Sequence, residues 1–191
     1  MAADPDAATG RRRRRRKRRV YWQKRKGLIY LFAARQICTT LCGQPKSVID
    51  VGSNGTPTLE WHRATAARLV SLDLRRPYIA EGVESLTCDF LEYEPETSFD
   101  LVTCFQVLEH VPDPVAFARK LLQMGEIAVV SVPYKWKKGR CRYHLHDPVN
   151  ERKMRKWFGR DPDFSYIATE LNTVNRLIHV YKQQVSFSTP A

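Results

Sequence analysis

Apolar positions in this chain form short runs that alternate with segments of helical spacing. The runs are rich in Val, Ile and Leu, and runs of four to seven such residues are typical of buried strands. We expect strands at 47–51, 69–73, 84–87, 99–104 and 126–132. We expect helices at 21–41, 57–67 and 112–124. Strands that alternate with helices predict an α/β domain built on a parallel sheet.

The last third of the chain follows a different pattern. Asp147-Pro148 favours the start of a helix that ends near Trp157. Residues 164–170 and 176–182 alternate in polarity on either side of Leu171-Asn172-Thr173, which predicts an antiparallel hairpin. Earlier in the chain, only ten residues separate the second and third expected strands, so we expect a crossover of about one helical turn there.

Charge is unevenly distributed along the chain. The net charge is +12, but residues 1–27 hold twelve Lys and Arg against two Asp, so the remaining 164 residues carry only +2. Arg11–Arg19 are nine consecutive cations that repel each other and cannot pack. We therefore expect a disordered basic arm at 1–20, one folded domain at 21–185 and a frayed tail at 186–191. The arm is compatible with nucleic-acid phosphates, an anionic membrane surface, a nuclear-type address, or simple solvation.

Cysteine usage indicates a reducing compartment. The five cysteines are odd in number and include no CxxC pair, which disfavours a disulfide frame and a zinc site. No apolar run reaches the length that a membrane-spanning helix needs. We therefore expect a cytoplasmic protein without a transmembrane segment.

The stretch at 47–57 combines a buried strand with a tight turn that contains glycine. Gly52, Asn54 and Gly55 suit a turn that brings backbone N–H groups close to a ligand at the end of the first strand. Asp73 ends the second expected strand about twenty residues further on. A carboxylate at that place accepts hydrogen bonds from ribose hydroxyls in nucleoside-binding sheets.

With Cys88-Asp89-Phe90 and the motif at 99–114 (FDLVTCFQVLEHVPDP), the chain resembles the class I S-adenosylmethionine-dependent methyltransferases of the small-molecule and glycan type. The resemblance runs from about residue 45 to 133. It implies a Rossmann-like, doubly wound sheet of seven strands, mostly parallel, that ends in a C-terminal antiparallel hairpin. A dinucleotide-binding dehydrogenase is the structural rival, but its glycine pattern fits less well.

The resemblance also implies a cofactor site for S-adenosylmethionine. The cofactor-binding positions that it implies are Asp50, Gly52, Ser53, Asn54, Gly55, Asp73, Leu74, Asp89, Phe90 and Gln106. Here the chain departs from the usual three alternating glycines, because Asn54 and Thr56 occupy the second and third positions. The loop must therefore differ slightly in shape from that of the family.

The Glu109-His110 pair allows two interpretations. Some relatives, including small-RNA 2′-O-methyltransferases, bind a divalent metal through a Glu-x-x-Glu-His array. In this chain Gln106 replaces the first glutamate, which removes a charged ligand. We therefore predict no metal, and His110 is either a structural residue or part of the catalytic machinery.

A second candidate cluster is His144-Leu145-His146-Asp147, where this fold places its acceptor pocket. Alternate residues of an extended segment point to the same side, so we expect both histidines to face the pocket. We predict His146 as the base that deprotonates an acceptor hydroxyl, with Asp147 orienting it. The alternatives are that the cluster only caps the following helix, or that alignment alone suffices for transfer.

The segment 134–160 holds ten Lys and Arg against two acids. Its aromatics and cations suit an anionic small molecule or glycan, or stacked RNA bases. The predicted substrate-binding residues are Tyr134, Trp136, Arg140 and His144. We predict O-methylation of a small-molecule or glycan acceptor. The alternatives are an RNA methyltransferase that uses the basic arm, and a non-catalytic module that binds cofactor or polyanion.

Overall fold

The computed structural model describes residues 28–171 and 174–183. In chain order the elements are α2 (Ile29–Leu41), β1 (Ser47–Val51), the 3₁₀ helix η1 (Thr58–His62), β2 (Arg68–Asp73), β3 (Glu84–Thr87), β4 (Phe99–Phe105), α3 (Pro114–Met124), β5 (Gly125–Tyr134), α4 (Glu151–Phe158), β6 (Phe164–Thr169) and β7 (Asn175–Lys182). The predicted basic arm, the beginning of the helix expected at 21–41 and the predicted tail lie outside the described residues.

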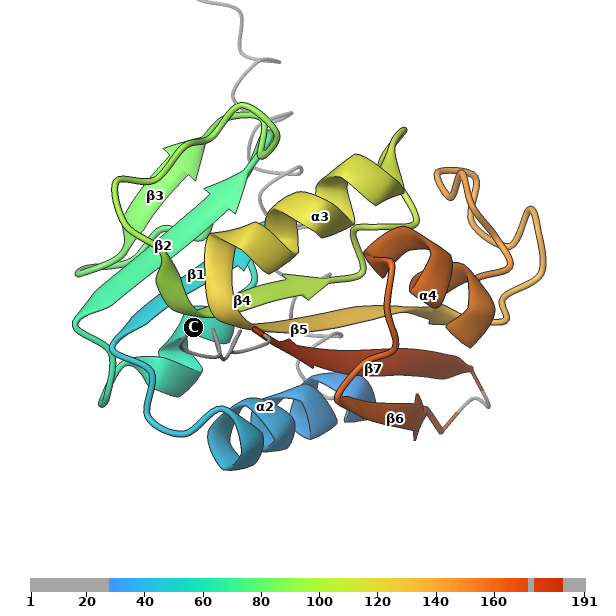
Figure 1. Ribbon diagram of the computed structural model, residues 1–191, viewed down its shortest axis with the longest axis horizontal. Coiled ribbons are helices and arrows are strands. Elements are labelled where there is room, and N and C mark those ends of the chain that lie inside the picture. Colours follow the sequence, from blue (N-terminus) through green and yellow to red (C-terminus); the bar gives the residue numbers. More distant parts are fainter. Residues whose placement is uncertain (1–27, 172–173, 184–191) are drawn as a thin grey trace, which may run out of the picture.

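The strands form one seven-stranded sheet in the order β3-β2-β1-β4-β5-β7-β6 (Figure 1). Neighbouring strands from β3 to β5 are parallel, whereas β7 is antiparallel to both β5 and β6. The strand order reverses between β1 and β4, and such a switch point leaves a crevice at the carboxyl ends of the strands. The predicted fold class, including the C-terminal hairpin, is confirmed.

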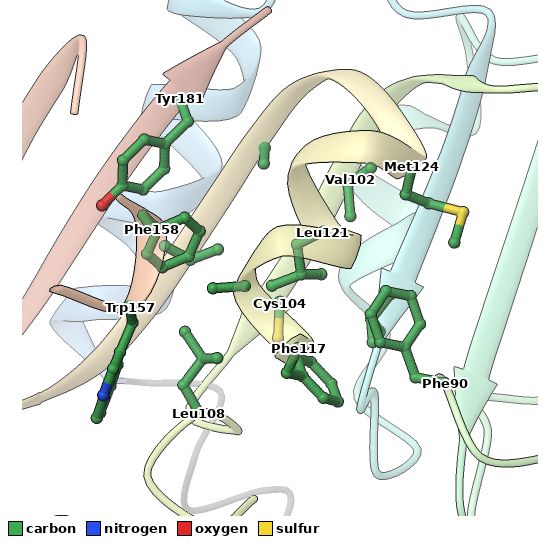
Figure 2. Close-up of a cluster of buried hydrophobic side chains, with 14 of the residues drawn as sticks. Phe90, Val102, Cys104, Leu108, Phe117, Leu121, Met124, Trp157, Phe158 and Tyr181 are labelled. Atoms are coloured by element: carbon green, nitrogen blue, oxygen red, sulfur yellow. The ribbon is translucent and has the colours of Figure 1, made fainter. Parts of the chain in front are cut away.

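Helices cover both faces of the sheet. The helices α3 and α4 lie over one face, and α2 lies over the opposite face (Figure 1). On the first face, Leu121 of α3 and Phe158 of α4 belong to one buried cluster, in which Phe158 stacks on Tyr181 of β7 at 4.1 Å between ring centroids (Figure 2). On the second face, Ala34 and Cys38 of α2 are fully buried against the sheet. The central strands are buried on both sides, as expected from their apolar runs.

The start of α2 is held by a carboxylate from a distant strand end. Glu170 follows β6 and accepts hydrogen bonds from the backbone N–H groups of Ile29 at 2.8 Å and Tyr30 at 3.2 Å. A negative charge at this end of a helix satisfies its first N–H groups and interacts favourably with the helix dipole. Glu170 is buried and also pairs with the guanidinium of Arg176 at 3.4 Å.

Two expected helical segments differ in the structure. The helix expected at 57–67 is only the five-residue η1. The N–H groups of Ala67 and Arg68 both donate to the backbone carbonyl of Lys46, so the chain is no longer helical there. The crossover between β2 and β3 contains no helical turn. Tyr78 N–H donates to the hydroxyls of Ser71 and Ser53 and keeps this segment extended.

Two other helices begin later than expected because polar side chains cap them. Asp113 accepts from the N–H groups of Val115 and Ala116, so α3 begins at Pro114 and not at residue 112. Asn150 accepts from the N–H of Lys153, so α4 begins at Glu151.

All five cysteines lie in the described part of the chain and are free thiols. The sequence had disfavoured a disulfide frame. Burial raises the pKa of the Cys104 thiol well above its ordinary value. None of the helices in residues 28–171 and 174–183 is both long enough and apolar enough to cross a bilayer.

Candidate active site

A cavity of about 1090 Å³ lies at the carboxyl ends of β1, β2 and β4. Gly52 after β1, Asp73 at the end of β2 and Gln106 after β4 all line it. Its opposite side is formed by Trp136 and His144, which follow β5. The cavity therefore has one end at the nucleoside-binding edge of the sheet and another at the segment predicted to hold the acceptor.

The turn after β1 comes very close to the loop after β4. Gly52 has φ of +74°, and a Cβ built on it would lie 2.4 Å from a γ-carbon of Val107. Only glycine fits such a place, because it tolerates positive φ and leaves room for the neighbour. Asn54 adopts φ of +46° in the same turn and donates its N–H to Asp73 at 2.8 Å. The second glycine position of the family is thus occupied by Asn, which accepts the left-handed region more readily than most other non-glycine residues.

Asp73 lies at the end of β2 and lines one end of the cavity. Besides the bond from Asn54, its other carboxylate oxygen accepts from the N–H groups of Arg75 at 2.8 Å and Arg76 at 2.7 Å. These bonds fix the orientation of a carboxylate that lines the cavity and carries acceptor capacity for ribose hydroxyls. Ribose binding by Asp73 stays a prediction.

Asp89 and Phe90 form the next part of the wall. Asp89 accepts from the N–H of Leu91 at 2.9 Å, and Phe90 is buried against Phe117 of α3 with ring centroids 4.6 Å apart. Leu74 lines the same region and is 60% exposed. A carboxylate beside two apolar surfaces can bind the amino edge and the ring of a purine base.

Three predicted cofactor residues do not line this cavity. Gly55 is absent from the cavity wall, and the Ser53 hydroxyl accepts from the Ser71 hydroxyl at 2.9 Å. Asp50 is buried and accepts from the hydroxyl of Thr103 at 2.7 Å and from that of Thr58. Burial raises the pKa of Asp50 to about 7, although both hydroxyl bonds act in the opposite direction. Their structural role is to hold the turn.

Trp136 forms a stacked aromatic surface at the other end of the cavity. Its ring lies nearly parallel to that of His144, at 27° and 5.6 Å between centroids. The guanidinium of Arg176 lies 5.3 Å from the Trp136 ring, and that of Arg140 lies 5.0 Å from it. The indole N–H donates to Asn175 at 3.1 Å and fixes the ring plane. An aromatic surface flanked by cations favours a planar or anionic acceptor.

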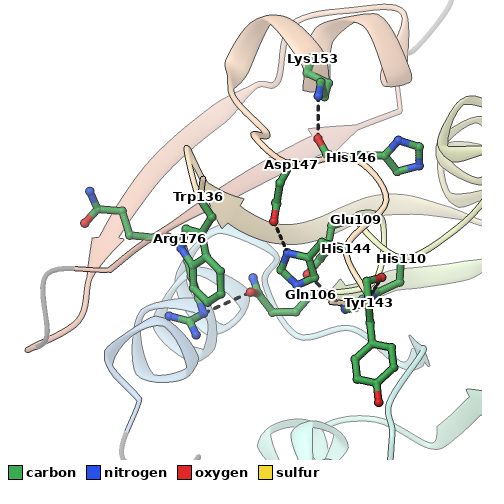
Figure 3. A network of polar contacts seen from close by, with 11 residues as sticks. Gln106, Glu109, His110, Trp136, Tyr143, His144, His146, Asp147, Lys153 and Arg176 are labelled. Carbon is green, nitrogen blue, oxygen red and sulfur yellow. Dashed lines mark hydrogen bonds and ion pairs between the residues drawn. The ribbon is translucent and has the colours of Figure 1, made fainter. Parts of the chain in front are cut away.

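The two histidines of the second cluster do not face the same side, contrary to our expectation. Residues 141–148 turn and are not extended. His144 lines the cavity and bonds to Asp147 at 2.8 Å, whereas His146 bonds to the Val111 carbonyl at 2.7 Å and contacts Trp157. Figure 3 shows the His146 ring pointing away from the other histidines. His146 therefore does not line this cavity, and Asp147 orients His144 instead.

His110 lies in the cavity wall beside His144. The two rings meet edge to face at 4.7 Å, and His110 Nδ1 bonds to the carbonyl of Tyr143 at 2.9 Å. Glu109 is almost fully buried, with one oxygen 3.8 Å from His110 Nε2. One ligand atom from each of Glu109, His110 and His144 lies within 4.8 Å of the other two, a spacing that could hold a metal ion.

Of the other predicted substrate residues, neither Tyr134 nor Arg140 lines the cavity. The Tyr134 hydroxyl donates to Glu151 at 2.6 Å. Conversely, the sequence analysis did not identify Arg176, which comes from β7, donates to the Gln106 side chain at 3.2 Å and lines the cavity. No local motif marks Arg176, since it meets Gln106 across 70 positions of sequence.

This strand order, with a carboxylate at the end of β2 and a glycine turn after β1, defines the class I S-adenosylmethionine-dependent methyltransferase fold. The sequence model of the family described as "Methyltransferase domain" matches residues 14–168. That match covers most of the chain, and the chain therefore belongs to this methyltransferase family.

Individual relatives agree with this assignment. The chain is 34% identical over 92 residues to the ubiquinone biosynthesis O-methyltransferase of Aliivibrio fischeri strain MJ11. The match covers 41% of this chain and 39% of that protein. The chain thus matches about two fifths of that relative's length. The protein of the same name from Ralstonia nicotianae is 33% identical over 86 residues. That match covers 39% of this chain and 36% of that protein.

Solved structures share the fold at lower identity. The 1,6-didemethyltoxoflavin-N1-methyltransferase of Burkholderia thailandensis, crystallised with that compound and S-adenosylhomocysteine, superposes with a TM-score of 0.68 at 16% identity, covering 96% of this chain and 92% of its own. The N-methyltransferase NodS of Bradyrhizobium japonicum, in complex with S-adenosylhomocysteine, gives 0.63 at 12% identity, covering 79% and 84%. The cofactor of this class is S-adenosylmethionine.

Proposed function

We propose that this chain transfers the methyl group of S-adenosylmethionine to an oxygen atom of a small-molecule acceptor. The observation that carries the proposal is one continuous cavity that joins the carboxylates of Asp73 and Asp89 to the platform of Trp136 and His144. Its volume of about 1090 Å³ exceeds the roughly 300–1,000 Å³ of pockets that hold one drug-sized ligand. There is space for a cofactor and an acceptor side by side.

The residues fit the cofactor at each point where it must be held. Asp73 offers oxygens to the ribose, Asp89 and Phe90 offer a carboxylate and an aromatic edge to the base, and Gly52 leaves the turn without a side chain. When bound, the cofactor supplies an electrophilic methyl group on a positively charged sulfur. The task of the protein is then to align an acceptor oxygen with that methyl group and to exclude water.

The acceptor end supports an oxygen nucleophile on a flat or anionic small molecule. Trp136 provides an aromatic face, and Arg176 places a cation next to it. His144, held by Asp147, lines this end of the cavity and can accept a proton from the acceptor. The curated relatives named above carry an O-methyltransferase name, and this supports oxygen as the acceptor atom.

Two measurements test the proposal. Titration calorimetry with S-adenosylhomocysteine should show binding by the full chain, weakened at least tenfold by Asp73→Ala because the ribose loses its carboxylate partner. Transfer of isotopically labelled methyl groups to a panel of phenols, hydroxy acids and sugars should then identify acceptors. A folded protein that does not bind S-adenosylhomocysteine, or that methylates only nitrogen in a matched amine panel, would contradict the proposal.

A further inference from the structure

Arg176 is a buried cation in the wall of the cavity. Its side chain is 9% exposed, and its guanidinium lies beside Trp136, at the end of the cavity that His144 also lines (Figure 3). We propose that Arg176 binds a carboxylate group of the acceptor, so that the acceptor is a hydroxylated carboxylic acid. The proposal rests on the methyl transfer proposed above and names the class of molecule that receives the methyl group.

The place of Arg176 in the cavity follows from the direction of β7. Because β7 runs antiparallel to β5, its first residues lie at the carboxyl edge of the parallel strands, where the cavity is found. Arg176 is the second residue of β7 and pairs with Pro133 near the end of β5. A strand inside the sheet therefore carries this cation, and such an element positions a binding group more precisely than a loop does.

Two aromatic rings and two polar side chains hold the guanidinium. Its carbon lies 4.7 Å from the centre of the Tyr30 ring and 5.3 Å from that of Trp136. Its Nε donates to the amide oxygen of Gln106 at 3.2 Å, and Nη1 pairs with Glu170 at 3.4 Å. The guanidinium is thus oriented before a ligand arrives, which lowers the entropic cost of binding.

The contacts of Arg176 with Gln106 and Glu170 are long. A charge-assisted N–H···O bond usually measures about 2.7–2.9 Å, and both of these contacts exceed that length. Gln106 is neutral and also lines the cavity, so its amide oxygen holds a place that an incoming carboxylate oxygen can take over. A carboxylate offers two charged oxygens to the planar guanidinium, and the resulting bonds are shorter and stronger than the bond to an amide.

Glu170 does not cancel the charge of Arg176 completely. The same carboxylate accepts from the N–H groups of Ile29 and Tyr30 at the start of α2. The start of a helix carries a partial positive charge of about half a unit. Arg176 and the helix start together therefore outweigh one carboxylate, and the remaining positive potential favours an anion.

The charges of the cavity wall favour a ligand group with one negative charge. Among the described residues, the wall contains the arginines Arg75 and Arg176 and the carboxyl groups of Asp73, Asp89, Glu109 and Asp113. Arg75 follows Asp73 and does not belong to the end of the cavity that Arg176 lines. A phosphate dianion is best held by several cations, whereas one guanidinium matches one planar carboxylate.

Trp136 indicates the size of the acceptor. Its ring lies 5.3 Å from the guanidinium of Arg176 and 5.6 Å from the ring of His144. Both groups therefore flank one indole, and a single aromatic ring that carries a carboxylate and a hydroxyl spans a comparable distance. With its carboxylate at Arg176, such an acceptor directs its hydroxyl toward His144, and this fixed direction is the alignment that transfer requires.

Matched pairs of acids and amides test the proposal, because an amide keeps the shape of a carboxylate without its charge. The probes are ortho-, meta- and para-hydroxybenzoate and para-hydroxyphenylacetate, each with its amide. They are titrated by calorimetry into the full chain in the presence of S-adenosylhomocysteine. For at least one pair we expect the acid to bind about 10–100-fold more tightly than the amide. Arg176→Met should remove this preference, and Arg176→Lys should keep only part of it, because an ammonium lacks the planar geometry.

Arg140→Met is the matched control. The Arg140 guanidinium lies 5.0 Å from the same Trp136 ring, but Arg140 is exposed and does not line the cavity, so this variant should keep the wild-type preference. Arg176→Met takes one partner from the buried Glu170. The double variant Arg176→Met with Glu170→Gln removes both charges and keeps the test decisive if the single variant does not fold. Circular dichroism verifies the folding of every variant.

The inference is overturned if no acid of the panel binds more tightly than its amide, or if Arg140→Met removes the preference as completely as Arg176→Met does. It is also overturned if Arg176→Met weakens S-adenosylhomocysteine as much as the acids, because Arg176 would then bind the carboxylate of the cofactor. Methyl transfer to neutral phenols without any preference for acids would refute the carboxylate site alone. A preference for acids without methyl transfer would refute the proposed function alone.

Discussion

His144 and Asp147 form a buried pair, with His144 Nδ1 2.8 Å from a carboxylate oxygen of Asp147 and exposed fractions of 5% and 1% for the two side chains. This pair fixes the His144 ring at the cavity wall. His146, two positions further on, serves the fold through Val111 and Trp157. The acceptor end therefore depends on one histidine of this segment and not on both.

The first prediction concerns the different roles of His144 and His146. We expect His144→Gln to reduce kcat for methyl transfer about a hundredfold, because the acceptor loses the group that positions it. The affinity for S-adenosylhomocysteine should stay within about threefold, since His144 lies at the other end of the cavity. His146→Ala should instead lower the free energy of unfolding by about 1–3 kcal/mol through loss of its hydrogen bond. Unchanged kcat in His144→Gln would refute this assignment.

A second prediction concerns the turn after β1. Gly52→Ala should destabilise the protein by about 2–4 kcal/mol, because it adds strain at positive φ to a clash with Val107. Gly139 is a matched control, since its φ is +85° and a Cβ there would meet nothing within 4 Å. Gly139→Ala should cost only about 1 kcal/mol. The additional change Val107→Ala should recover part of the loss in Gly52→Ala, which urea unfolding can measure.

The third prediction follows from the buried carboxyl of Asp50. Burial raises its pKa from 3.8 to about 7, so the folded protein binds a proton more tightly than the unfolded chain does. The associated stability is complete below pH 4 and is lost as the pH rises through 7. The groups that act on Asp50 are Thr58, Thr103 and Asp73.

Between pH 5 and 8 this loss amounts to about 2–3 kcal/mol. Asp50→Asn should remove that decline, because the amide does not ionise. Unfolding free energies in urea at both pH values provide the measurement, with other titrating groups common to both proteins. Parallel pH profiles for the wild type and Asp50→Asn would show that Asp50 does not cause the decline.

A fourth prediction concerns the cap of α2. Glu170→Gln removes the charge that faces Ile29, Tyr30 and Arg176, and we expect a loss of about 2–3 kcal/mol in unfolding free energy. Glu126→Gln, at an exposed position of β5, serves as the control and should change stability by less than about 0.5 kcal/mol. Equal effects of the two substitutions would mean that the cap contributes nothing specific.

The local sequence pattern was sufficient to predict the strands, but it was not sufficient to predict the segments that connect them. The apolar runs at 47–51 and 126–132 became β1 and the central part of β5, because short runs rich in β-branched residues suit strands that are buried on both faces of a parallel sheet. Strand order came from the resemblance to a family, since no local signal encodes it. The helix expected at 57–67 failed because tertiary bonds, such as that of the Thr58 hydroxyl to Asp50, compete with helical propensity.

The candidate site shows the same contrast. Asp73 and Gly52 were expected at the cofactor site from the strand ends that precede them and from the family resemblance, and the structure places both in the cavity wall. The expectation for His146 failed because a single turn between residues 141 and 148 reverses which side a residue faces. Arg176 left no trace in the local sequence, since its contacts depend on how β7 docks against β5.

The carboxylate of Glu170 contacts both Arg176 in the cavity and the first backbone N–H groups of α2, so it connects the cavity to this helix. Arg176 lines the cavity and contacts Glu170, and Glu170 in turn protects the amide protons of Ile29 and Tyr30. A ligand that draws the guanidinium of Arg176 toward itself changes the hold of Glu170 on these two amides. Hydrogen–deuterium exchange at the first turn of α2 should therefore register whether the cavity is occupied.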